Sequence, residues 1–310
     1  MTRGRQKRRI QMRHIGDLWR GHGAARRSSA LIGLAIVTCL CGAAGASAKT
    51  GLGHYVRLAP GVRSHGQLLR IRPRLGLNTN SSGNWFGYNQ GTLEQGAKLF
   101  NSIGGQWTVP TATQHTPGQQ ESSSDWIGIG GGCIDAGCTL TDATLIQTGT
   151  EQDVSASGSP SYYAWWELVP APEFQITSMT VNPGDRMSAS IAELVPDSEV
   201  WTISIKDLTN GQSYSTTVPY PSTHTTAEWI EETPLLLGTN AGFAALPNLS
   251  TPAFDLATTN GQPANLKPSE ELNLVDSSGH VIGAPSAPDP DADGFNACTW
   301  ATTCAAPGSS

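Results

Sequence analysis

Three short segments of this chain alternate polar and apolar residues in a way that could line one reactive cleft. Because successive side chains of a strand point to opposite faces, each segment presents one set of residues to a single side. These sets are Gln147, Gly149 and Glu151; Tyr163, Trp165 and Glu167; and Glu228, Ile230 and Glu232. A carboxyl group can exchange a proton with a reacting group, and a carboxamide N–H can donate to a developing oxyanion. Convergence of the three faces would give a cleft lined by carboxylates, an amide and an indole.

Other familiar catalytic signatures are missing from the sequence. The histidines beyond residue 80, His115, His224 and His280, are scattered and form no H-E-x-x-H zinc motif. There is no G-x-S-x-G elbow, no P-loop and no complete dinucleotide fingerprint. Asp-Thr-Gly and Asp-Ser-Gly, the tripeptides expected of an aspartic protease, are also missing. We therefore expect no cofactor.

One acidic loop resembles a calcium-binding loop in part. Asp289, Asp291, Asp293 and Gly294 occupy the first, third, fifth and sixth positions of such a loop, but the twelfth position is Trp300 instead of the bidentate glutamate. Prolines are also interleaved with the first aspartates. A turn before a last strand at 295–300 is the favoured interpretation, so no metal site is expected.

The elements that must position these groups are short strands. Apolar, aromatic and β-branched runs are separated by clusters of Gly, Pro, Asn and Asp, and no stretch offers a long amphipathic helix. Asn210-Gly211 and Asp276-Ser277-Ser278-Gly279 are typical hairpin turns. This pattern predicts an all-β sandwich, jelly roll or barrel. The runs that carry the prediction are 106–109, 126–129, 162–168, 187–191, 200–205 and 272–275.

Charge is distributed very unevenly along the chain. Beyond residue 74 there are four basic residues against twenty-four Asp and Glu, a formal charge of 4 minus 24, or -20, whereas residues 1–74 hold fifteen Lys and Arg and one acid. An apolar run from Ala30 ends at Ala46-Ser47-Ala48, which is typical of a secretory signal with an A-x-A cleavage site. The acidic body repels phosphate, so nucleic acid is excluded as a partner.

The charge pattern divides the chain into three parts. We expect a signal peptide at 1–48, a basic propeptide at 49–80 and one domain at 81–310. A solvated linker is the alternative for 49–80. Coulomb attraction to the acidic body favours a propeptide that inhibits at neutral pH and is released as carboxylates protonate. The mature chain is then secreted through either the general or the twin-arginine route, is free of the membrane and is monomeric.

The cysteines of the mature part suggest two disulfides. Cys39 and Cys41 leave with the signal, so an even number remains in an exported chain. Three connectivities are open, and we prefer the local pairs, which are Cys133 with Cys138 and Cys298 with Cys304.

Six segments in order resemble the motifs of the glutamic peptidases, also called eqolisins. The resemblance covers roughly 84–300, essentially the whole mature chain, and six motifs in order are far more specific than any one alone. The resemblance implies a sandwich of two antiparallel sheets, similar to a concanavalin A-like jelly roll, with the active site on a concave sheet. It also implies a pepstatin-insensitive acid endopeptidase acting on polypeptides. The segments are 84–87 (NWFG), 106–110 (QWTVP), 126–129 (WIGI), 145–149 (LIQTG), 163–167 (YAWWE) and 227–232 (AEWIEE).

The resemblance assigns a catalytic dyad. The family's glutamine lies within L-I-Q-T-G and is Gln147 here, and its glutamate closes A-E-W-I-E-E and is Glu232 here. Glu232 would take a proton from the attacking water and return it to the leaving amine, while the Gln147 amide would stabilise the oxyanion. Trp126 and Trp165 match aromatic positions of the site, with core packing as the alternative for each.

Neighbouring residues receive weaker assignments. Glu167 belongs to the same motif as Trp165 and is expected to orient Gln147 or a water molecule. Glu228 shares the face of Glu232 and either raises its pKa by like-charge repulsion or is solvated. Glu231 points to the opposite face and receives no role.

The chain also departs from the fungal members of the family. Gly130 and Tyr163 stand where those members carry acids, Glu151 replaces an aspartate, and Val169 replaces an aromatic residue. Tyr163 and Glu151 remain candidates for substrate binding. The hydrogen bonds around the dyad are therefore expected to differ, so neither pH optimum nor cleavage preference transfers from the family.

Two other functions fit parts of the sequence. Jelly rolls also host lectins and glycosidases with paired glutamates and tryptophan platforms, in which Glu167 and Glu232 would act as acid and nucleophile. That alternative leaves Gln147 and the basic propeptide unexplained. A non-catalytic adhesive module fits secretion and disulfides equally well.

Overall fold

The computed structural model describes residues 63–68, 80–237 and 241–308. In this part of the chain the regular structure is β-strand apart from one short 3-10 helix, η1 (Pro268–Glu270). The described residues include no helix long and apolar enough to cross a membrane. The predicted signal peptide and most of the predicted propeptide lie outside these residues.

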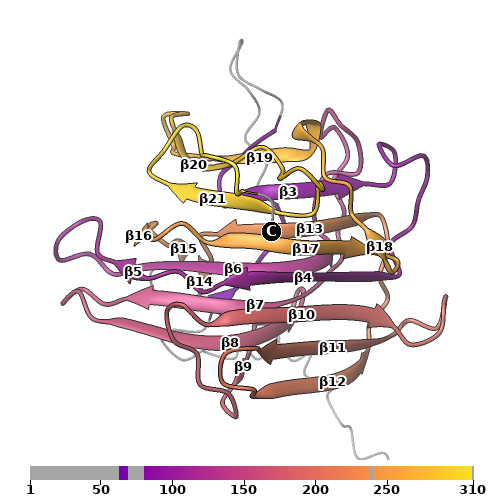
Figure 1. Cartoon of the computed structure of the whole chain (residues 1–310), viewed down its shortest axis with the longest axis horizontal. Helices are drawn as coiled ribbons and strands as arrows, with labels where there is room; N and C mark the ends of the chain where they lie inside the picture. The colour runs from indigo at the N-terminus through magenta and orange to yellow at the C-terminus, as the bar shows by residue number, and fades with distance from the viewer. Residues whose placement is uncertain (1–62, 69–79, 238–240, 309–310) are drawn as a thin grey trace, which may run out of the picture. The chain divides into compact units, whose positions relative to one another are not determined.

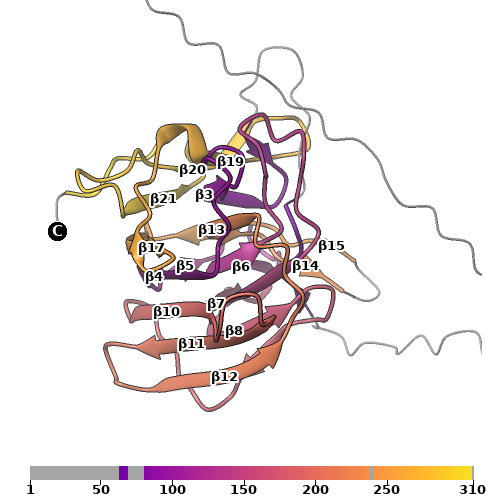
Figure 2. The same ribbon diagram turned by 90° about the vertical axis from the view of Figure 1, so that its right-hand side faces the viewer.

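One continuous sheet, folded on itself, supplies both layers of the domain (Figures 1 and 2). Its described strands follow the order β12-β11-β10-β4-β17-β21-β20-β19-β3-β13-β6-β7-β8-β9. The layer that carries the predicted site consists of β3 (Trp85–Gly91), β13 (Thr226–Glu232), β6 (Glu121–Gly130), β7 (Leu145–Val154), β8 (Pro160–Leu168) and β9 (Phe174–Ile176). The second layer consists of β4 (Ser102–Thr108), β10 (Arg186–Glu193), β11 (Val200–Asp207), β12 (Ser213–Pro219) and β17 (Ala253–Thr259).

Shorter strands complete the sheet and its surroundings. The two layers are joined through β19 (Glu271–Val275), β20 (Val281–Pro285) and β21 (Phe295–Thr299), with β2 (Ser81–Ser82) beside β19 and β18 (Gln262–Pro263) beside β17. Two small sheets form separately from it. One consists of β1 (Arg63–Ser64), β14 (Leu235–Leu236) and β15 (Gly242–Phe243), and the other of β5 (Ala112–Thr113) and β16 (Asn248–Leu249). All these pairings are antiparallel except that of β2 with β19.

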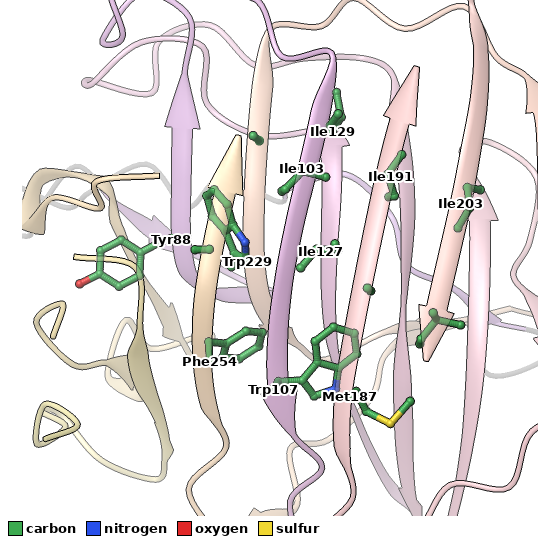
Figure 3. Packing of buried hydrophobic residues seen from close by; sticks show 14 of the residues in the cluster. Tyr88, Ile103, Trp107, Ile127, Ile129, Met187, Ile191, Ile203, Trp229 and Phe254 are labelled. Atoms are coloured by element: carbon green, nitrogen blue, oxygen red, sulfur yellow. The ribbon is translucent and has the colours of Figure 1, made fainter. Parts of the chain in front are cut away.

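The hydrophobic core lies between the two layers. In Figure 3, Trp107 of β4 and Met187 of β10 come from one layer, and Ile127 of β6 and Trp229 of β13 come from the other. Strands of the second layer alternate buried apolar and more exposed polar residues, as in β10 and β11. Burial of alternate apolar residues is the main force that holds two such layers together.

Strands β6 and β13 differ because every residue in them is buried. One face of each contributes to the core, and the other carries the polar residues of the predicted site. Burial of both faces means that something covers the site face.

Several local predictions are confirmed. The hairpin turns at Asn210-Gly211 and 276–279 connect β11 to β12 and β19 to β20. Disulfides join Cys133 to Cys138 and Cys298 to Cys304, which are the preferred local pairs. The last long strand is β21 after the acidic loop, although it ends at Thr299, one residue earlier than predicted.

Candidate active site

Strand register brings the predicted site residues into three rows on one face of the site layer. Residues paired across antiparallel strands point to the same side, so each row runs across β3, β13, β6, β7 and β8. The rows are Asn89, Glu228, Gly128, Gln147 and Glu167; Gly87, Ile230, Trp126, Gly149 and Trp165; and Trp85, Glu232, Ser124, Glu151 and Tyr163. The three faces predicted from the sequence therefore do converge.

Glycines in the rows make room for the larger side chains. A Cβ atom at Gly149 would lie 2.5 Å from Cβ of Trp126, and one at Gly128 would lie 2.9 Å from the Trp126 ring and 3.2 Å from Cβ of Gln147. Such separations are too short for non-bonded carbon atoms. The bare backbone at both positions thus allows the indole and the carboxamide to lie side by side above the sheet.

Glu232 is fully buried and held by an indole. The Trp126 Nε1–H donates to Oε2 of Glu232 at 2.8 Å, whereas Oε1 has no hydrogen-bond partner among the described residues. Burial raises the pKa of Glu232, and hydrogen bonds from His65 and Trp126 oppose that rise. The carboxyl group therefore has one anchored oxygen and one oxygen available for chemistry.

Gln147 lies in the first row and is oriented by Glu167. Its Nε2–H donates to Oε2 of Glu167 at 3.3 Å and to the backbone carbonyl of His65. Burial raises the pKa of Glu167 to about 7, and the charge of His65 and the hydrogen bond from Ser64 oppose that rise. The expectation that Glu167 orients Gln147 agrees with this contact.

The site face is covered by residues 63–68, a segment we call the strap. Its first two residues form β1, which pairs with β14, and the Arg63 carbonyl accepts the N–H of Glu173 at 3.3 Å. Farther along, the Leu68 N–H donates to the Gly131 carbonyl at 3.1 Å, and the Leu68 side chain packs in the cluster of Trp85 and other site residues. The strap belongs to the predicted propeptide, and this position explains the burial of the face.

Arg63 is the most strongly paired residue of the strap. Its Nη1 lies 2.9 Å from Glu151, 2.6 Å from Asp153 and 3.0 Å from the Tyr163 hydroxyl. Burial opposes its charge, but the neighbouring carboxylates outweigh it, so the pKa of Arg63 is raised. Glu151 and Tyr163, which were candidates for substrate binding, thus bind a guanidinium group of the chain itself.

His65 lies at the centre of the site. Its ring stacks on Trp165 with centroids 3.6 Å apart, Nδ1 lies 3.4 Å from Oε2 of Glu232, and Nε2 lies 2.8 Å from Glu173. Burial opposes protonation, but the hydrogen bonds and charges of Glu173 and Glu232 together outweigh it and raise the pKa of His65 well above its usual value. Burial likewise opposes ionisation of Glu173, but the hydrogen bonds from His65 and Tyr163 and the charges of His65 and Arg63 together hold its pKa below the usual value.

All seven residues predicted for the dyad and its surroundings lie on the site face, namely Gln147, Glu232, Trp126, Trp165, Glu167, Tyr163 and Glu151. Trp165 also donates its Nε1–H to Ser124 at 2.9 Å, so both indoles support polar groups of the site. Sequence reasoning missed Arg63, His65, Ser124 and Glu173. The only signal for the first two was the basic, acid-free character of 49–80.

The two suggestions for Glu228 are not supported. Glu228 is fully buried, so a solvated role is wrong, and burial raises its own pKa well above the usual value. It lies in the first row, two rows from Glu232, and the pKa of Glu232 is shifted by burial and, in the opposite direction, by His65 and the indoles of Trp126 and Trp85. Glu231 points to the opposite face as predicted, where it adjoins Asp125.

A steric reason explains why position 130 is glycine here and not an acid. Its φ of +98° lies in the region that favours glycine, and a Cβ atom there would collide with the Thr144 carbonyl. The Tyr163 hydroxyl accepts from Arg63 at 3.0 Å and donates to Glu173 at 2.7 Å, so it connects the strap arginine to an acid of the domain.

The acidic loop forms a turn. Oδ1 of Asp289 accepts the N–H groups of Asp293 and Gly294, both at 3.1 Å. Asp255, Asp289 and Asp293 approach one another, and burial together with the neighbouring acids raises the pKa of Asp293 to about 6. The turn favoured from the sequence matches these bonds.

Comparison with solved structures places the domain in a known fold class, the β-sandwich of the glutamic peptidases. Scytalido-glutamic peptidase, solved with a transition state analog inhibitor, superimposes with a TM-score of 0.55 over 70% of this chain and 98% of that chain, at 17% identity. SCP-B, a member of the Eqolisin family solved with the tripeptide Ala-Ile-His, gives a TM-score of 0.51 over the same shares at 18% identity. The predicted all-β sandwich is thereby confirmed.

The sequence itself establishes the family. The model of the Peptidase A4 family matches residues 83–289, and the chain belongs to that family. Aspergillopepsin-2 from Aspergillus niger is 25% identical over 154 residues, which cover 43% of this chain and 51% of that protein. The chain thus spans about half the length of this curated relative.

Proposed function

We propose that the mature chain is a secreted acid endopeptidase that hydrolyses peptide bonds through Gln147 and Glu232. The observation that supports this proposal most directly is that both side chains contact one strap residue, His65. Gln147 donates to its backbone carbonyl, while Glu232 lies 3.4 Å from its ring. A substrate carbonyl in the position of the His65 carbonyl would accept the amide N–H of Gln147, which is where an oxyanion donor is needed.

Each residue of the dyad has a defined task. Glu232 accepts a proton from water through its unpartnered Oε1 while the water attacks the carbonyl carbon, and it then returns the proton to the leaving nitrogen. Gln147 keeps its N–H aimed at the carbonyl oxygen because Glu167 accepts from the same nitrogen.

One assay separates this function from its rivals. Mature protein is incubated with denatured casein at about pH 3, with and without pepstatin, and separately with polysaccharide. We expect casein hydrolysis that pepstatin does not reduce, because the proposed dyad contains no aspartate pair. Hydrolysis of polysaccharide alone would favour the glycosidase, and inertness toward both substrates would favour the adhesive module.

We further propose that segment 49–80 is an inhibitor released by acid. The strap places the cations Arg63 and His65 on Asp153, Glu151 and Glu173. Since the pKa of Glu173 is lowered and that of His65 is raised, their ion pair persists between those two values and is lost as pH falls through the lowered one. The strap should therefore bind near neutrality and dissociate in acid.

Binding of a synthetic 49–80 peptide to mature protein tests the inhibitor. We expect affinity at least about tenfold higher at pH 7 than at pH 3, measured by calorimetry. Arg63→Gln in the peptide should weaken binding at pH 7 by a further factor of about ten or more, because it leaves Glu151 buried without its partner. Arg57→Gln removes the same charge and controls for long-range attraction. Equal binding at both pH values would refute acid release.

Secretion completes the proposal. Two disulfides are typical of chains that fold in an oxidising compartment. The signal at 1–48 and the A-x-A site are its support in the sequence.

A further inference from the structure

The strap lies on the site face as a substrate would. Its backbone is extended through the pairing of β1 with β14, and the carbonyl that Gln147 contacts belongs to His65. The peptide bond on the far side of that carbonyl joins His65 to Gly66. We propose that the chain hydrolyses its own His65–Gly66 bond, so that the processed protein begins at Gly66. The inference rests on the proposed endopeptidase function and adds the bond at which the precursor is cut.

Anchors on both sides hold this bond in place. On the N-terminal side, Glu167 accepts the His65 N–H at 2.7 Å and the Ser64 hydroxyl at 2.6 Å, while Arg63 is fixed by its acids. On the C-terminal side, the Gln67 amide donates to the Ala143 carbonyl, and the Leu68 N–H donates to Gly131. Holding a reacting bond in one geometry contributes a large share of catalysis, so these anchors favour hydrolysis here over other strap bonds.

The environment of Gly66 suits a leaving group. A Cβ atom at Gly66 would meet nothing within 4 Å, so the amine that forms there has space to accept a proton and depart. The φ angle of Gly66 is also not positive, so alanine can adopt the same backbone conformation. This position therefore offers a conservative control substitution.

The chemistry balances with water as the only co-reactant. A water oxygen attacks the His65 carbonyl carbon and gives one proton to Oε1 of Glu232, and the oxyanion forms against the Gln147 N–H. The carbon–nitrogen bond to Gly66 then breaks as Glu232 transfers its proton to that nitrogen. The products are a carboxyl group on His65 and an amine on Gly66.

The test follows the precursor itself. Full-length precursor purified at neutral pH is acidified in steps to about pH 3, so that the strap is still bound in the first steps, and the products of each step are identified by intact mass and N-terminal sequencing. We expect a chain that begins at Gly66, formed with a rate constant that does not change when protein concentration is varied about a hundredfold, because the reaction is intramolecular. A new N-terminus elsewhere, from a precursor that becomes active on casein, would overturn this inference and leave the proposed function intact.

Matched variants sharpen the test. Gly66→Ala should be cut at the same bond, whereas Gly66→Pro, which removes the N–H and adds a ring at the leaving nitrogen, should slow that cut at least about a hundredfold. Glu232→Gln should leave the bond uncut, and a thermal melt like that of the wild type would show that it is folded. Unchanged cleavage of Gly66→Pro at this bond would refute the inference. A wild-type precursor that cuts neither itself nor casein would refute the proposed function as well.

Discussion

Glu232→Gln is expected to lower kcat on a peptide substrate by about 10²- to 10⁴-fold while the protein stays folded, because glutamine cannot accept the proton of the attacking water. The substitution preserves the shape of the side chain. Its carboxamide oxygen can still accept from the Trp126 indole, which now donates to Oε2 at 2.8 Å. The loss should therefore appear in kcat with little change in melting temperature. Protein from which His65 has been removed is the right material, since His65 contacts the same oxygen.

Gln147→Ala should cost about 10²- to 10³-fold in kcat, the usual effect of removing one oxyanion donor. Glu228→Gln is the matched control for both variants. Glu228 lies on the same strand and the same face as Glu232 and is equally buried, but it stands in a different row. It should retain near wild-type turnover. Fully active, folded Glu232→Gln protein, or equal losses in all three variants, would remove the proposed mechanism.

The sequence predicts the composition of the site face well because strand alternation is a local property. Residues 147, 149 and 151 share a face in any regular strand, whatever strand lies beside them. The register between strands is not local. Alternation places Glu228 and Glu232 on the same face without choosing between them, and the register sets Gln147 level with Glu228 and Glu232 level with Glu151. Only the resemblance to a family singles out Glu232 as the proposed partner of Gln147.

The strap could not be placed from the sequence. Residues 63–68 have no strand or helix periodicity, and most of their contacts are with distant parts of the chain, such as Glu167 and Leu235. Net charge indicated attraction between the basic segment and the acidic body, but net charge does not determine which residue of the segment lies against which residue of the body. What fixes His65 over the dyad is the shape of Trp165 and the positions of Glu173 and Glu232, which depend on the complete fold.

The acidic composition of the chain beyond residue 74 predicts a protein that is most stable in acid, because protonation removes repulsion among its carboxylates. A buried pair of carboxyl groups on the opposite face of the site layer gives that prediction a specific cause. Asp125 and Glu231 are fully buried neighbours on β6 and β13, and the Gln152 amide donates to them at 3.1 Å and 3.4 Å. Burial raises the pKa of Asp125 to about 7, and burial together with Asp125 raises the pKa of Glu231 well above its usual value. Two such groups tolerate one another only while at least one of them is protonated.

The sign of the pH effect follows from these shifts. Both acids have a higher pKa in the folded chain than in the unfolded chain, so the folded state binds more protons. Their contribution to stability is complete below the ordinary value near 4 and is lost as pH rises through about 7. The melting temperature of mature protein should therefore fall between these pH values, whereas a steady rise from about pH 4 to pH 8 would contradict the assignment.

Asp125→Asn should flatten that dependence. The asparagine amide can donate to Glu231 at any pH, so one buried charge no longer faces a second acid when the pH rises. Each unit of pKa shift removed changes the free energy of unfolding by about 1.4 kcal/mol. Near pH 7 the free energy of unfolding of the variant should therefore exceed that of the wild type by on the order of a few kcal/mol. Thermal melts at several pH values, with Glu199→Gln as a variant of an exposed carboxyl, measure the difference. If Asp125→Asn and wild-type melting temperatures decline in parallel across this range, then another group governs acid stability, and the buried acids nearest the strap, Glu151 and Glu167, become the next to replace.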